Sequence, residues 1–190
     1  DKAANGGREV HHYWRHVRGF DKDFVSITDD TYRACENSWS FAIIRDPAKR
    51  LMSAYSNRIG YHGEMKRGGL KRRLKAATKG LGLNPDINAF FRNFDAYRAL
   101  DFSVDHHTRP QTDFVGTELS KLDAVYRIED MDALAAELRD RTGYSGVMPR
   151  EQTGGVKYKI EDLDAKSVEA LKRITAEEYR HLKDFYSPPW

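Results

Sequence analysis

FAIIRDPAKRLMSAYSNRI, residues 41–59, is the stretch that decides the fold of this 190-residue chain. Its four opening apolar residues predict a short buried strand, which ends at Arg45. The Asp-Pro pair that follows suits the cap and the first turn of a helix. Along that helix, apolar side chains recur at every fourth position and predict a stripe that faces the core. The stripe consists of Leu51, Tyr55 and Ile59.

The opposite side of the same helix presents Ser53, which has no core to fill. A strand-end arginine supplies fork-shaped donors, and the start of the helix supplies backbone N–H groups and a favourable dipole. Arg45, Ser53 and the first helical turn therefore have the parts of a phosphate-binding site. The alternative is an ordinary strand-to-helix turn with a capping aspartate and a surface arginine.

This stretch resembles the 3′-phosphate-binding motif of sulfotransferases that use 3′-phosphoadenosine 5′-phosphosulfate (PAPS), in the branch that sulfates carbohydrates. The pattern RDP…RL.SAY of that branch is found here in residues 45–55. Two weaker signals follow in the family's order, RPQTDF at residues 109–114 and DAVYRIED at residues 123–130. The resemblance covers roughly residues 41–190, and it implies that Arg45 and Ser53 hold the 3′-phosphate of the nucleotide.

The resemblance implies an α/β fold, with a central parallel sheet flanked by helices in a P-loop-like, nucleotide-binding sulfotransferase fold. The chain itself agrees, because predicted strands alternate with predicted helices, and such alternation favours a parallel sheet. Nucleotides bind such sheets beyond the C-terminal ends of the strands. The predicted strands are residues 24–28, 41–44 and 124–128. The predicted helices are residues 8–17, 29–36, 47–59, 70–78, 88–100, 131–141 and 164–185.

Enzymes of this family hold the 5′-phosphosulfate in a loop that has Pro-Lys after a strand and a Ser or Thr a few residues on. The opening of this chain, DKAANGG, resembles such a loop in its lysine, its small residues and the helix predicted after it. It departs from the pattern because Asp1 replaces the proline, Gly6-Gly7 replaces a hydroxyl pair, and no strand precedes it. An earlier natural start, an altered N-terminus and a tail without a nucleotide role all fit these departures. The residues assigned to the loop are Lys2, Ala3, Ala4, Asn5, Gly6 and Gly7.

The implied reaction is in-line transfer of a sulfuryl group from PAPS to a hydroxyl or amine, which leaves 3′,5′-adenosine bisphosphate (PAP). Positioning and charge neutralisation matter most in such a transfer, by analogy with phosphoryl transfer. Lys2 could supply positive charge at the bridging oxygen. The implied partners are the nucleotide donor and, as acceptor, an anionic or hydroxylated glycan or small molecule.

A histidine or carboxylate must also take the acceptor proton. His107 is the leading candidate because it begins HTRPQ, which is similar to a His-x-x-Pro-Gln-like stretch on the acceptor side of carbohydrate sulfotransferases. His12 and His16 share one face of a predicted helix and are further candidates. The alternative for each histidine is an ordinary surface or loop role. A zinc site from these histidines lacks a cysteine or HExxH context, so no metal is expected.

Two further cations have predicted roles at the nucleotide. Arg58 lies late in the predicted helix 47–59, called the motif helix below because it carries the RL.SAY residues. Lys157 lies in GGVKY, before the last predicted helix. In this family, the loop before the last helix often returns to the cofactor. Solvent exposure is the alternative for both cations. Glu129 and Asp130 follow a predicted strand and are interpreted as structural residues that pair with a basic neighbour or cap the next helix.

Length favours one domain, residues 1–190, and the resemblance implies that it is a single sulfotransferase-like domain. No apolar run approaches the length of a membrane span, so stable membrane insertion is not expected. Seven cations and no acid fall between Met65 and Pro85, in a basic and flexible insert predicted at about residues 60–83. This segment is either a solvated face or a means of drawing in an anionic acceptor or nucleotide.

The single cysteine, Cys35, cannot form an internal disulfide, and the chain has no N-glycosylation sequence. A soluble, cytoplasmic protein of bacterial type is therefore expected, with a lumenal domain of a Golgi enzyme as the alternative.

Two other functions stay open. A small P-loop phosphotransferase is one, although the chain lacks a complete GxxxxGK[ST] loop. A degenerate nucleotide- or polyanion-binding module without turnover is the other, and the altered loop and the basic insert favour it. Nucleic acid is not an expected partner, because the cations of the insert are not interleaved with aromatic residues.

Overall fold

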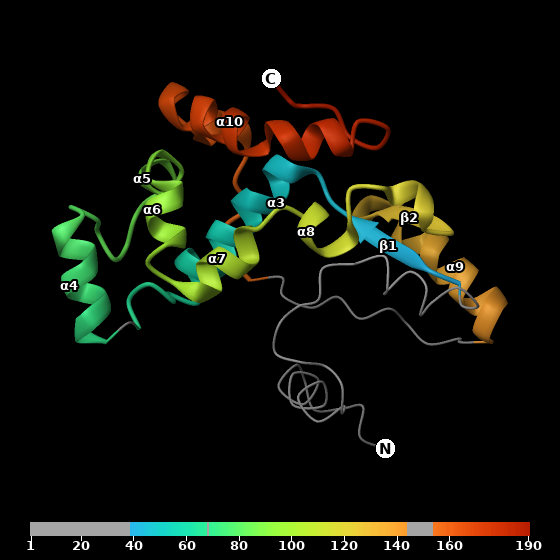
Figure 1. Cartoon of the computed structure of the whole chain (residues 1–190), viewed down its shortest axis with the longest axis horizontal. Helices are drawn as coiled ribbons and strands as arrows, with labels where there is room; N and C mark the ends of the chain where they lie inside the picture. The colour runs from blue at the N-terminus through green and yellow to red at the C-terminus, as the bar shows by residue number, and fades with distance from the viewer. Residues whose placement is uncertain (1–38, 68, 144–153) are drawn as a thin grey trace, which may run out of the picture.

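The computed structural model describes residues 39–67, 69–143 and 154–190 (Figure 1). The elements predicted at residues 8–17, 24–28 and 29–36 lie outside these ranges, as does the N-terminal loop. The described strands are β1 (Phe41–Ile44) and β2 (Ala124–Arg127). The described helices are α3 (Pro47–Ala54), η1 (Tyr55–Tyr61), α4 (Leu70–Thr78), α5 (Ile87–Arg92), α6 (Phe94–Arg98), α7 (Phe102–Thr108), α8 (Thr112–Val115), η2 (Leu119–Lys121), η3 (Ile128–Asp130), α9 (Met131–Thr142), η4 (Ile160–Asp162) and α10 (Ala165–His181).

The two strands pair in parallel, with Phe41 opposite Ala124 and Ile44 opposite Arg127. Both predicted strands and the parallel pairing are confirmed. Within the described ranges the sheet has these two strands, so the larger central sheet stays a prediction. Parallel strands need a long crossover, and here the segment from α3 to η2 provides it.

Helix α3 begins as predicted. Asp46 Oδ1 accepts a hydrogen bond from the Lys49 N–H at 2.8 Å, and Pro47 occupies the first turn. The stripe of Leu51, Tyr55 and Ile59 is buried. At Tyr55 the helix widens into the π-helix η1, which carries the same stripe on to Ile59.

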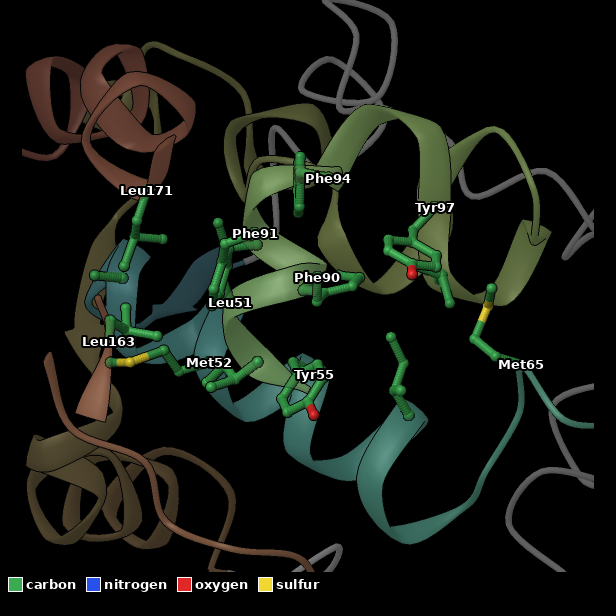
Figure 2. Packing of buried hydrophobic residues seen from close by; sticks show 14 of the residues in the cluster. Leu51, Met52, Tyr55, Met65, Phe90, Phe91, Phe94, Tyr97, Leu163 and Leu171 are labelled. Carbon is green, nitrogen blue, oxygen red and sulfur yellow. The ribbon is translucent and has the colours of Figure 1, made fainter. Parts of the chain in front are cut away.

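The main core forms where α5 and α6 cover α3 (Figure 2). The single helix predicted over residues 88–100 is wrong in one respect, because it is broken at Asn93 into α5 and α6. The Asn93 side chain donates to the Ala89 carbonyl at 2.9 Å and so competes with the helical ladder. The predicted apolar positions are nonetheless all buried. They are Phe90, Phe91, Phe94, Tyr97 and Leu100.

Helix α10 crosses α3 and α5, as Figure 1 shows. It starts where predicted, since Asp164 accepts from the Ser167 N–H at 2.8 Å, and its regular part ends at His181. The C-terminal tail returns to the sheet, because the Tyr186 hydroxyl lies 3.2 Å from the Ile44 carbonyl and 2.6 Å from Glu129.

The remaining elements also meet their expectations in part. Helix α9 ends before Gly143, whose φ is 70°. Asp130 pairs with Arg127 at 2.7 Å, which supports the interpretation of Asp130 as a structural residue that pairs with a basic neighbour. Helix α4 has its predicted bounds. Helices α7 and α8 were not predicted; the cap of α7 is Asp101, which accepts from the Val104 N–H. None of the described helices combines the length and apolar character that a membrane crossing requires.

Candidate functional site

Arg45 directly follows β1, and its backbone is held by the side chain of Gln111. The Arg45 N–H donates to Gln111 Oε1 at 2.7 Å, and Gln111 Nε2 donates to the Arg45 carbonyl at 2.7 Å. This pair of bonds replaces a strand partner at the point where the sheet ends. The Arg45 side chain is half-buried and forms no ion pair with any residue in the described ranges. Its position is therefore fixed while its guanidinium is available to an anion.

A buried carboxylate from α10 organises this region. Glu178, 4% exposed, accepts from the backbone N–H and the Nε2 of Gln111, both at 2.8 Å. Its other oxygen lies 3.5 Å from Arg50 Nη2. Glu178 thus joins the last helix to α3 and to the loop before α8.

Arg50 of α3 is the partner of this carboxylate. Burial lowers its pKa, and Glu178 opposes that shift. Arg50 Nη1 donates to the His107 carbonyl at 3.3 Å, so the side chain also ties α3 to the end of α7. Its buried Nε–H finds no hydrogen-bond acceptor in the described part of the chain. A buried, unsatisfied cationic donor is the kind of group that an anionic ligand would satisfy.

Ser53 lies on the face of α3 opposite the core, half-exposed and without a hydrogen-bond partner among the described residues. Ser56, one turn on, donates to the Val156 carbonyl at 2.6 Å. Gly155 has a φ of 104°, and a Cβ there would come within 2.5 Å of Ser56 Oγ. The loop before α10 therefore presses against the side of the motif helix that carries Ser53. Lys157 follows in that loop and is exposed.

A cavity of about 280 Å³ opens beside Arg50. Its lining comes from β1, α3, α7, α8 and the loop between the last two: Ile43, Arg50, His106, His107, Gln111, Phe114 and Val115. Burial lowers the pKa of His107 to about 4, with further lowering by the charges of Arg58 and His106 and partial opposition from Glu64. The ring is consequently neutral at pH 7 and can accept a proton.

Arg58 lies on the His107 side of the site. Its Nη1 is 3.2 Å from Glu64 Oε1, and Glu64 Oε2 accepts from the Ser103 hydroxyl at 2.7 Å. The charge of Arg58 also lowers the pKa of His106, after burial and Arg109. This side of the motif helix therefore carries positive charge close to the cavity.

A larger cavity, about 510 Å³, lies at the junction of α6 and α7. Three aspartates in its lining oppose anion binding. Each of them pairs with an arginine: Asp95 with Arg173, Asp101 with Arg72 and Asp105 with Arg98. The smaller cavity is the better candidate, because it adjoins the motif helix and its cations.

The structure thus brings Arg50, His107 and Gln111 together around one cavity and places Arg45 beside Gln111. Arg58 does not line this cavity, but its charge reaches His107. Lys2, Ala3, Ala4, Asn5, Gly6, Gly7, His12 and His16 lie outside the described residues. Within the described part, no group of three or more His, Cys, Asp or Glu side chains could hold a metal ion.

The sequence interpretation gave no role to Glu178, Arg50 or Gln111. A signal for Glu178 does exist in the chain. Glu178 occupies one of the positions of α10 that face the core, between the buried residues Leu171 and Leu182. A carboxylate at such a position requires a buried partner. Which partner it has cannot be inferred from that position.

Comparisons with known proteins give one family. The model of the sulfotransferase family matches residues 5–188, nearly the whole chain. No curated protein and no solved structure matches. Because the family match extends over far more than half of the sequence, this chain belongs to the sulfotransferase family.

Proposed function

We propose that this protein transfers a sulfuryl group from PAPS to a hydroxyl or amine of a carbohydrate or another small acceptor. Membership of the sulfotransferase family supports the transfer. The observation that carries the choice of an anionic nucleotide donor is Arg45, whose backbone is fixed by Gln111 while its guanidinium has no ion-pair partner in the described ranges.

Arg45 and Ser53 are the proposed ligands of the 3′-phosphate. Both are half-buried, and neither side chain is engaged by a described residue, so the motif residues that the family resemblance selects are free to bind. The loop at Gly155 approaches the same face of the helix, which supports Lys157 as a further cation for the nucleotide. For the 5′-phosphosulfate, residues 2–7 stay the candidates on sequence grounds alone.

The cavity beside His107 is the proposed acceptor side. When bound, PAPS would supply an activated sulfuryl group attached to a phosphate leaving group. The neutral His107 ring can take the acceptor proton, and Arg50 fixes the backbone of that residue through its carbonyl. A donor anion near Arg50 and Arg58 would offset the charges that lower the His107 pKa, and the ring would then bind a proton more readily.

The test is a thermal shift measurement with PAP and, separately, with ATP and magnesium. We expect PAP at about 100 times its Kd to raise the Tm of the protein by roughly 5–10 °C. R45A and S53A should lose most of this shift. Their unliganded Tm should change little, because Gln111 binds only the Arg45 backbone and the Ser53 hydroxyl has no described partner.

R139A is the matched control, since Arg139 is exposed on α9 and forms no ion pair with a described residue. It should keep the full PAP shift. A larger shift with ATP and magnesium than with PAP would favour a phosphotransferase. A PAP shift without sulfuryl transfer to any member of an acceptor panel would favour the binding module.

A further inference from the structure

Helix α4 is fixed to the body of the protein by one side only. Ala76 is its buried residue, and Arg72 pairs with Asp101, a carboxylate whose side chain is 4% exposed. Lys75 Nζ donates to the Ala99 carbonyl at 2.7 Å. These contacts hold the helix against the start of α7 and the end of α6, and they define which side of α4 faces outward.

The outward side of α4 carries an apolar ridge. Leu70 and Leu74 are 72% and 58% exposed, and their i, i+4 spacing places them on one line, away from Ala76. Scattered exposed leucines need no explanation, but two stacked leucines on the outermost line of a helix form a continuous apolar strip.

Cations border this ridge. On a helical wheel Lys71 falls on one side of the two leucines and Arg73 on the other. The exposed cations of the segment whose side chains form neither an ion pair nor a hydrogen bond with a described residue are Lys66, Arg67, Lys71, Arg73 and Lys79. The sequence between Met65 and Pro85 has no acid, so this charge is not compensated locally.

We propose that α4 docks the protein peripherally on an anionic lipid surface. The leucine ridge would enter the headgroup–acyl boundary, and the flanking cations would meet the lipid phosphates. A soluble polyanion would pair with the cations but would leave the apolar ridge without a partner, so the leucines favour the lipid surface. Figure 1 shows α4 at the opposite end of the described elements from α9 and β2, so docking through α4 would keep the strand-end site away from the lipid.

The experiment is co-sedimentation of the full chain with vesicles of phosphatidylcholine and phosphatidylglycerol at a 7:3 ratio, and with vesicles of phosphatidylcholine alone. We expect binding to the mixed vesicles only. L70Q/L74Q should weaken the partition roughly tenfold by removing apolar burial. K71Q/R73Q should weaken it by roughly tenfold or more by removing two charges.

R139Q/K183Q is the control, because it removes two exposed cations that lie outside α4 and have no ion-pair partner among the described residues. It should bind within about twofold of the wild type, since surface charge acts within a Debye length. Retention on heparin separates the two kinds of anion: L70Q/L74Q should retain the wild-type elution there.

Three results would overturn the proposal. They are no sedimentation of the wild type with mixed vesicles, an L70Q/L74Q variant that sediments like the wild type, and a control that loses as much binding as K71Q/R73Q. The second result would identify α4 as a surface for soluble polyanions. None of these measurements uses sulfuryl transfer, so the proposal stands or falls independently of the proposed function.

Discussion

The strand-end site and helix α4 hold their arginines in opposite ways. At the strand end, Arg50 is buried against Glu178 and bridges three elements of the fold. On α4, Lys71 and Arg73 are exposed and form no ion pair with a described residue, whereas Arg72 of the same helix pairs with Asp101. Burial of a cation costs desolvation free energy, so a buried cation needs a partner at a fixed position. An exposed cation attracts any nearby anion through its electrostatic potential. The first region suits one shaped ligand, and the second suits an extended surface.

The largest expected effect is at Glu178. E178A leaves Arg50 and two Gln111 donors buried without their acceptor, so we expect it to lower the free energy of unfolding by about 3 kcal/mol. Urea denaturation measures the change. E177A is the matched control because Glu177 is 75% exposed and pairs only at the surface, with Arg180 and His181. It should lower the free energy of unfolding by less than about 0.5 kcal/mol. Equal losses for the two variants would mean that the buried contacts of Glu178 stabilise the fold no more than surface ion pairs do.

A smaller effect should separate two neighbouring arginines within α4 itself. R72A leaves the buried carboxylate of Asp101 without its ion-pair partner and removes a hydrogen bond to the Glu64 carbonyl. It should therefore lower the free energy of unfolding by roughly 1–2 kcal/mol. R73A removes an exposed cation without a described partner and should change stability by less than about 0.5 kcal/mol. The same urea titrations compare them. If R73A proved the more destabilising, α4 would not be oriented as described.

The smallest effect should come from the protonation of His107. Its pKa is about 4 in the folded protein and about 6.5 in a model peptide. As pH falls below about 6.5, the unfolded chain takes the proton first, so stability is full above that pH and is lost toward pH 4. Between pH 7 and pH 5 this shift sets a ceiling of about 2 kcal/mol on the loss, and partial solvation of the ring should reduce it to below about 1 kcal/mol.

H107Q should flatten this dependence. Unfolding free energies of the wild type and H107Q at pH 5 and pH 7 provide the measurement, and the difference between the two proteins isolates the histidine from the carboxylates that also titrate. An identical pH dependence in the two proteins would mean that His107 is not desolvated, and the neutral-base assignment would then lose its support.

Some of this architecture follows from short stretches of the chain. Strand β1, the Asp46 cap and the stripe of Leu51, Tyr55 and Ile59 depend on residues within a few positions of one another, and all lie where predicted. The prediction of a buried strand is wrong for half of β1, because Phe41 and Ile43 are exposed among the described residues. The parallel pairing follows from the alternation of strands and helices. The helix break at Asn93 was missed because a side chain that competes for a local carbonyl leaves the apolar rhythm intact.

The sequence by itself determined where the motif lies and which family it belongs to, because strand patterns, caps and motif spacing are local. Only the tertiary structure decided how the motif is held. Gln111 reaches Arg45 across 66 residues, and Tyr179 donates to Asp46 across 133. Tertiary packing brings these partners together, and each pairing avoids the free-energy cost of a buried polar group without a hydrogen bond. The periodicity of the sequence does not predict which distant residue forms that hydrogen bond.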